Sequence, residues 1–205
     1  MKKRMKFVTP ALVAGLGATA LAATAVAVTQ PEPGGAGAAY RAAVSPASAA
    51  GFSSLRRAAG PSDHIPAASA SFFEESAAAG GFRVTAVRAL AAPGPSDLRY
   101  FLVAGERNGE PGLCLAQVPK QGVGLVAQCA AEADALREGI NGISGGPQGV
   151  VLYQVTADDT PPSLTANGRR AAASADHLAW IVTDSDATAS YKANGQTVKI
   201  EIPQL

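Results

Sequence analysis

The sequence predicts a mainly β protein, a small antiparallel sandwich or barrel with one or two short helices, preceded by a disordered linker. About eight or nine short runs of strand-type residues are separated by turn residues, which is typical of such folds. Asn-Gly pairs at 108–109, 167–168 and 194–195 favour tight hairpins, because both turn positions need positive φ. The two cysteines, Cys114 and Cys129, lie equally far from a turn expected at 121–122.

The N-terminus predicts export. A basic cluster at residues 2–6 precedes the uncharged segment 7–29, an order typical of a signal peptide. A small-x-small site allows cleavage after Ala27, so residues 1–27 are expected to be removed. The alternative is an uncleaved anchor, because about 20 apolar residues can span a bilayer. Residues 7–29 would then be the only contact with the membrane. Both alternatives place the rest outside the cytoplasm, secreted or anchored to the outer face of the cell membrane.

Two further segments precede the main domain. Residues 28–51 are rich in Pro, Gly and Ala and are expected to form a flexible linker. Residues 52–97 are expected to hold a short docking segment, a helix and a first strand. Phe52 and Leu55 have helical spacing. Ser71 and Glu74 fit a capping box for a helix ending at Gly80 and Gly81, and an alternating, half-buried strand pattern starts at Phe82.

Residues 98–205 are expected to be the β-rich domain. A strand from residue 98 should return at the first Asn-Gly pair, and the next hairpin should place Cys114 opposite Cys129. That register predicts one apolar strand face and one face with two glutamines. The apolar face would hold Cys114, Ala116, Val118, Leu125, Ala127 and Cys129, and the other face Gln117 and Gln128. A facing cysteine pair in an exported protein predicts a disulfide.

The rest of this domain is expected to continue in the same style. Residues 131–138 should form a short helix ending at Gly139, followed by a glycine-rich loop and a strand at 150–156. Trp180 lies in a run of apolar residues and is expected in the core. The last hairpin should pair residues 187–193 with 196–202.

One motif raises the possibility of catalysis. Residues 142–146 match Gly-x-Ser-x-Gly, and Ser144, Asp159 (or Asp158) and His177 follow in the order of a hydrolase triad. A nucleophile elbow needs a strand before it and a helix after it, whereas here a helix precedes and a strand follows. A flexible loop is therefore favoured over a small secreted serine hydrolase.

Composition argues against several other classes. The first 27 residues hold four basic residues and no acidic ones, so the mature chain carries about −3, and no nucleic-acid partner is expected. His64 and His177 are the only histidines, too few for a structural zinc site beside paired cysteines. Asp158 and Asp159 lack the spacing of a calcium loop, and residues 183–186 are expected to form a solvated turn. No metal or cofactor is predicted.

A short pattern links the chain to other sequences. Phe52-x-x-Leu55-Arg56-Arg57, Asp63-x-x-Pro66, a Gly-Leu-Cys-Leu strand, a second cysteine and a β-rich tail follow one another. This order resembles a group of uncharacterised exported or membrane-anchored proteins of high-GC Gram-positive (actinobacterial) bacteria, over about residues 52–205. The group has no established activity, so the resemblance implies location and β architecture only.

These observations favour an exported cell-envelope protein with a non-enzymatic binding or structural β-domain. Its partner would be an unknown envelope or extracellular ligand. One alternative is the small secreted serine hydrolase using Ser144 and His177. Another is a structural stalk in which the linker is the functional part.

Overall fold

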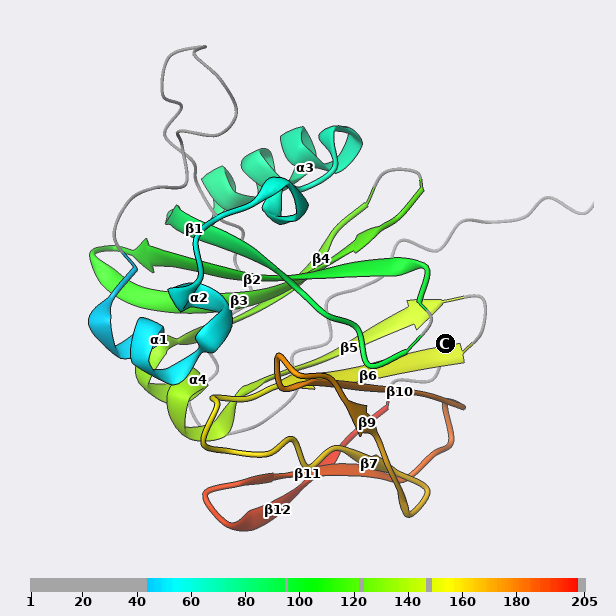
Figure 1. Cartoon of the computed structure of the whole chain (residues 1–205). Helices are drawn as coiled ribbons and strands as arrows, with labels where there is room; N and C mark the ends of the chain where they lie inside the picture. Colours follow the sequence, from blue (N-terminus) through cyan, green and yellow to red (C-terminus); the bar gives the residue numbers. More distant parts are fainter. Residues whose placement is uncertain (1–43, 95, 122–123, 147–148, 203–205) are drawn as a thin grey trace, which may run out of the picture.

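The computed structural model describes residues 44–202, apart from 95, 122–123 and 147–148 (Figure 1). The predicted signal peptide or anchor, and residues 28–43 of the predicted linker, lie outside the described residues. Within the described part of the chain, no helix is both long enough and apolar enough to cross a membrane.

The described chain is mainly β, as predicted, with a few short helices. The helices are α1 (Pro46–Gly51), α2 (Ser53–Arg56), the 3-10 turn η1 (Pro61–Asp63), α3 (Ala67–Ala79) and α4 (Glu132–Glu138). The strands of the first half are β1 (Phe82–Leu90), β2 (Leu98–Arg107), β3 (Glu110–Pro119), β4 (Val126–Ala131), β5 (Ile140–Gly146) and β6 (Gly149–Val155). Those of the second half are β7 (Thr165–Ala166), β8 (Arg169–Arg170), β9 (Ala172–Ala173), β10 (Leu178–Thr183), β11 (Ala189–Ala193) and β12 (Gln196–Ile200).

The first sheet, sheet A, is an antiparallel meander in the order β1-β2-β3-β4. Asn108 (φ 53°) and Gly109 (φ 86°) form the predicted turn between β2 and β3. Cys114 pairs with Cys129 across β3 and β4, which confirms the predicted register. A bulge between Val84 and Ala86 interrupts the pairing of β1 with β2.

Two further antiparallel sheets follow. Sheet B has the order β5-β6-β10-β9, and sheet C has the order β12-β11-β7-β8. The Asn-Gly pairs at 167–168 and 194–195 form the β7–β8 and β11–β12 turns, with positive φ at all four residues. The turn chemistry read from the sequence is therefore confirmed at all three predicted positions.

The sheets stack, and α3 covers the outer face of sheet A (Figure 1). One core cluster lies between α3 and sheet A, a second between sheets A and B, and a third between sheets B and C. Successive side chains of β6 point to opposite faces of sheet B and so belong to both of the last two clusters: Tyr153 faces sheet A, and Leu152 faces sheet C. Residues 52–97 share this core, since Phe52 and Leu55 are buried in the cluster between sheets A and B.

The predicted apolar face of the cysteine hairpin is confirmed, and it packs under α3. The opposite face differs from its prediction, because Leu113 and Leu115 are buried there as well, against sheet B. β1 is likewise buried on both faces, where a half-buried strand was predicted. A sheet between two layers has no solvent face, so its strands do not alternate in polarity as a surface sheet does.

Two predicted boundaries and one predicted loop are wrong. The last residues of the expected linker form α1, where Pro46 occupies the first turn and the Ser45 side chain accepts a hydrogen bond from the Ser48 amide at 3.0 Å. The helix expected from Ser71 begins at Ala67, so Ser71 lies inside α3 and not at its N-cap. The expected glycine-rich loop is β5, because each of its residues pairs with β6.

Candidate functional site

Ser144 lies in the middle of β5, in a strand and not at an elbow. It pairs with Val151, and its hydroxyl donates a hydrogen bond of 2.9 Å to Gln117 Oε1 on the facing sheet. Gln117 is buried. The Ser144 hydroxyl therefore helps to join sheets A and B.

His177 lies just before β10, at the other end of sheet B. Its backbone oxygen accepts from the Thr156 amide at 3.3 Å, and its Nδ1 lies 3.4 Å from the Thr160 oxygen. Ser144 pairs with Val151, five positions earlier along β6 than Thr156, which corresponds to about 16 Å at the rise of a strand. The two side chains are not brought together.

Neither aspartate completes a triad. Asp159 is exposed and accepts from the Thr160 hydroxyl at 3.1 Å. Asp158 accepts from Ser53, from its amide at 3.1 Å and its hydroxyl at 3.0 Å, and pairs with Arg56 at 2.9 Å. Burial raises the pKa of Asp158, but these hydrogen bonds outweigh it and hold the pKa below its usual value. Asp158 thus anchors α2 to the segment after β6.

The structure gives no donor set for a metal among the described residues. No group of three His, Cys, Asp or Glu side chains comes together there. His64 is exposed at the end of η1, and His177 lies just before β10. Asp184 and Asp186 lie exposed in the turn after β10, where a solvated turn was predicted.

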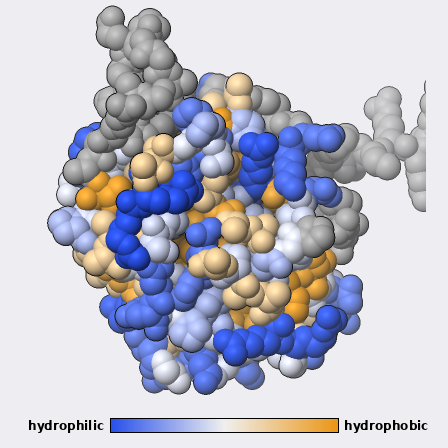
Figure 2. Space-filling model, viewed as in Figure 1, coloured by the Kyte–Doolittle hydropathy of each residue, from blue (hydrophilic) through white to orange (hydrophobic). Residues whose placement is uncertain are grey.

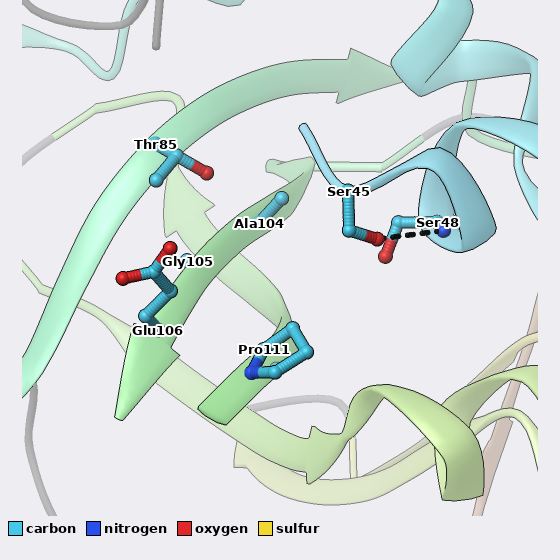
Figure 3. Close-up of a pocket in the computed structure, with 8 residues that line it drawn as sticks. Ser45, Ser48, Thr85, Ala104, Gly105, Glu106 and Pro111 are labelled. Carbon is cyan, nitrogen blue, oxygen red and sulfur yellow. Dashed lines mark hydrogen bonds between the residues drawn. The ribbon is translucent and has the colours of Figure 1, made fainter. Parts of the chain in front are cut away.

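A small cavity of about 80 Å³ lies between α1 and the edge of β1–β3 (Figure 3). Its polar lining comes from Ser45, Ser48, Thr85 and Glu106. The two serines are already engaged, because both hydroxyls and the Ser48 amide donate to Glu132 Oε1 at the start of α4. The cavity is smaller than the roughly 300–1,000 Å³ typical of ligand pockets, so it suits a few waters.

A second hollow, of about 300 Å³, lies at the surface between the β7–β8 hairpin and the end of β10. Asn167, Arg169 and Asp184 contribute polar groups, and Ile181 and Val182 contribute apolar ones. The Asn167 side chain is used by the fold, since its Oδ1 accepts from the Thr188 amide at 3.0 Å. The remaining charged groups, one of each sign, define no ligand chemistry.

The exposed apolar side chains are dispersed. Phe72 in α3 is 44% exposed, Val126 in β4 39% and Val182 in β10 37%. These residues come from three different elements. Figure 2 shows small hydrophobic groups interrupted by polar residues on the viewed face. This face presents no single large apolar patch of the kind that marks a protein-binding surface.

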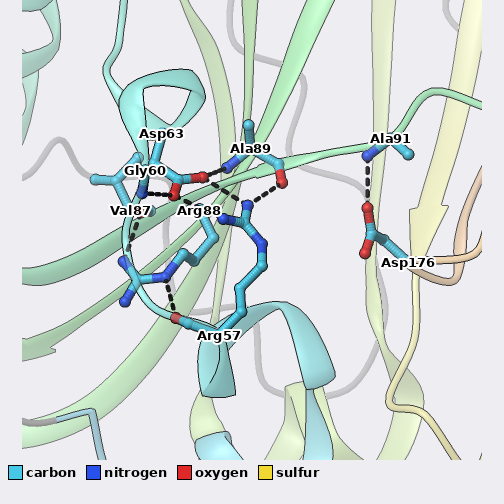
Figure 4. Close-up of polar contacts among 8 residues, drawn as sticks. All are labelled: Arg57, Gly60, Asp63, Val87, Arg88, Ala89, Ala91 and Asp176. Atoms are coloured by element: carbon cyan, nitrogen blue, oxygen red, sulfur yellow. Dashed lines mark hydrogen bonds and ion pairs between the residues drawn. The ribbon is translucent and has the colours of Figure 1, made fainter.

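The most connected polar cluster is an ion pair at the β1 side of sheet A (Figure 4). Arg57 donates two hydrogen bonds to Asp63, of 2.7 and 2.6 Å, and Asp63 also accepts from the amides of Gly60 and Ala89, each at 2.7 Å. Burial raises the pKa of Asp63, but these bonds together hold it below its usual value. We call Arg57, Asp63, Gly60 and Ala89 the latch.

The latch explains the sequence pattern that resembled exported proteins. Phe52 and Leu55 are buried, Arg56 pairs with Asp158, and Arg57 pairs with Asp63. Arg88 adds a further tie by donating to the Arg57 backbone oxygen at 3.1 Å. Sequence reasoning missed this pairing, because nothing in the spacing of six residues indicates it. The pattern holds the N-terminal helices onto the sandwich.

Cys114 and Cys129 form the predicted disulfide. It joins facing residues of β3 and β4, beneath α3. No free cysteine remains in the chain. The bond therefore fixes the register of one hairpin and links no distant strands.

The chain was compared with known proteins, and no protein-family model, no curated protein and no solved structure matches it.

Proposed function

We propose that this is an exported cell-envelope protein whose β-sandwich is a non-catalytic binding or structural domain. The observation that carries the proposal is the Cys114–Cys129 disulfide, which uses both cysteines of the chain. Disulfides persist in oxidising compartments outside the cytoplasm and are rare within it. The signal-like pattern of residues 1–27, or an anchor at 7–29, accounts for the export.

The engagement of the candidate catalytic groups supports a non-catalytic role. The Ser144 hydroxyl is bound to Gln117, and His177 lies about 16 Å further along the sheet at the rise of a strand. A serine nucleophile needs a base within hydrogen-bond reach. The domain would instead bind or space an envelope or extracellular ligand through its surface.

Export is tested by expressing the full chain with its own N-terminus and separating cytoplasm, membrane and medium. We expect the protein outside the cytoplasm, with both cysteines resistant to thiol labelling until a reductant is added. A cytoplasmic protein with reactive thiols would contradict the proposal. N-terminal sequencing of the exported form distinguishes the two routes: a start at Val28 indicates a signal peptide, and an intact Met1 an anchor.

The non-catalytic role is tested with a fluorophosphonate probe on the folded, exported protein. We expect the wild type and Ser144→Ala to show the same low background labelling. Covalent labelling of Ser144 in the wild type, absent from Ser144→Ala, would establish the hydrolase instead. Incubation of the immobilised protein with envelope material then seeks the bound component.

A further inference from the structure

Two open strand edges lie at the same side of the sandwich. β4 is the last strand of sheet A, and β5 is the first strand of sheet B. The two strands follow each other in the chain through α4 (Figure 1) and contact each other. The Ser144 hydroxyl of β5 also donates to Gln117 of β3. We call the β4 and β5 edges together the open flank.

Each strand of the open flank pairs on one side only within the described residues. β4 pairs with β3, and β5 pairs with β6. Val126 is exposed, and the other β4 residues are half-buried, in contrast to the nearly buried β1. The backbone groups on the outer side of both strands are therefore available for pairing.

The open flank lacks the protection that strand edges ordinarily carry. Residues 121–131 and 139–151 contain no charged side chain, and neither β4 nor β5 contains proline. Lys, Pro, bulges and short strands are the devices that prevent edge-to-edge association. Two stacked edges without any of them are an unusual arrangement for a protein that stays monomeric.

The other edges of the sheets carry those devices. β1 has a bulge, contains Arg83 and Arg88, and is packed against α2, η1 and α3. β12 contains Lys199, while β8 and β9 are two residues long, β8 consisting of two arginines. Because the other edge strands are charged, bulged, short or covered by helices, we expect edge pairing only at the open flank.

We propose that the open flank pairs with the open flank of a second copy of this chain. Two neighbouring antiparallel strands are related by a two-fold axis normal to their sheet. Because sheets A and B are stacked, a single two-fold axis can pair β4 with β4 of the copy and β5 with β5 of the copy. Each sheet would continue across the dimer as eight strands. The protected opposite flank prevents the head-to-tail contact that would produce a filament.

The number of hydrogen bonds favours a second copy over a single extended peptide. Six- and seven-residue edges can each form about six inter-chain hydrogen bonds. One edge alone offers about half of the roughly ten found in a typical specific interface, and both together reach it. A single peptide strand fills one edge, whereas a copy presents both edges at the matching spacing.

The disulfide prepares the β4 edge for this contact. Cys129 lies in the middle of β4 and is bonded to Cys114 of the buried strand β3. The disulfide keeps β4 extended and in register with β3 before a second copy binds. An edge ordered in advance loses less conformational entropy on association.

The test measures association of the exported wild-type protein by analytical ultracentrifugation over a range of concentrations. We expect a concentration-dependent dimer. Hydrogen exchange should show protection at 126–131 and 140–145 that rises with concentration, while 82–90 stays unchanged. Val126→Lys, which places a charge on an exposed edge position, should weaken dimerisation at least tenfold.

The matched control is Thr197→Lys, which adds the same charge to exposed edge strand β12. It should dimerise like the wild type. Gln128→Lys is a second β4 variant, used if Val126→Lys fails to fold by circular dichroism. A monomer at all concentrations, a dimer insensitive to both β4 variants, or protection of only one edge would overturn the proposal. If both edges were protected from hydrogen exchange in a monomer, the proposal would also be wrong, and residues 1–43 of the same chain would be the occupant to test next.

Discussion

The two flanks of the sandwich hold their edge strands by different means. At the β1 flank, short helices and the latch supply charged and polar partners from outside the sheet. At the open flank, the supports lie behind the edge: the Cys114–Cys129 disulfide within sheet A, and the close packing of Tyr153 over Gly142 within sheet B.

The difference concerns the unpaired backbone groups of an edge. The latch satisfies two of them directly, since the Ala89 amide donates to Asp63 and the Ala89 backbone oxygen accepts from Arg57 at 2.8 Å. A disulfide or a packed ring stabilises a strand without occupying its outer hydrogen bonds. The β1 flank is thus closed, and the β4–β5 flank is held in place but open.

Loss of the latch should have the largest effect on stability. Asp63→Ala removes a carboxylate that is 3% exposed, leaves two amides without their acceptor, and leaves Arg57 with only the Ala89 oxygen. Breaking a buried pair costs about 3–5 kcal/mol, and we expect about 3–4, since the Arg57 side chain is 39% exposed. Urea unfolding of wild type and variant measures the loss. Asp159→Ala, at an exposed carboxylate, is the control and should change stability by less than about 0.5 kcal/mol.

The latch also predicts a pH dependence. The pKa of Asp63 is lower in the folded state than in the unfolded state. The contribution of Asp63 to the free energy of unfolding is therefore complete at pH values above its unfolded pKa of about 3.9. The contribution should disappear as the pH falls through the lower folded pKa. Between pH 6 and pH 2.5 the wild type should therefore lose more stability than Asp63→Ala. Parallel pH profiles for the two proteins would contradict this expectation.

Removal of the disulfide should have the next largest effect, at the other flank. The bond closes a loop of 15 residues, which corresponds to about 3 kcal/mol. For a domain of this size that equals a fall in Tm of roughly 6–12 °C. We expect this fall in Tm for the double variant Cys114→Ala/Cys129→Ala in calorimetry. Its amide hydrogens should also exchange faster at 126–131 than at 82–90. An unchanged Tm would mean that packing alone sets the β4 register.

The comparison of flanks also shows what the sequence could predict. The predicted Asn-Gly turns and the cysteine register were recognisable, because both depend on residues close together in the chain. Asn141-Gly142 has the same two residues but lies inside β5, pairing with Gln154 and Tyr153. There the glycine makes room for a ring that arrives from the neighbouring strand.

The candidate site depended on distant contacts and was less predictable. The Ser144 motif looked like a loop because glycine-rich segments rarely form strands, yet pairing with β6 overrides that preference. The engagement of Ser144 by Gln117 spans 27 positions, and the latch joins η1 to β1. Neither contact has a local pattern from which to infer it.

A methyl group at Gly142 should have an intermediate effect at the open flank. A Cβ there would lie 2.3 Å from the Tyr153 ring and hydroxyl, and that ring is 1% exposed and cannot move away. We expect Gly142→Ala to lose about 1–3 kcal/mol in urea unfolding. At the control position, Gly124, a Cβ would meet Pro119 at an ordinary 3.6 Å, so Gly124→Ala should differ little from the wild type. Equal changes in unfolding free energy for the two substitutions would show that the β5 strand or the Tyr153 ring can shift to make room for the methyl group.

The smallest effect should come from an exposed ion pair of the β1 flank. Arg83 pairs with Glu106 across β1 and β2, and the two side chains are 53% and 38% exposed. Exposed pairs contribute about 0–1 kcal/mol, so Arg83→Gln should change the unfolding free energy by less than about 1 kcal/mol, and less still at high salt. A larger loss would mean that surface charge, as well as the latch, holds β1. A small loss leaves Arg83 a different role: it protects the edge of sheet A against pairing, a role for which β4 has no equivalent.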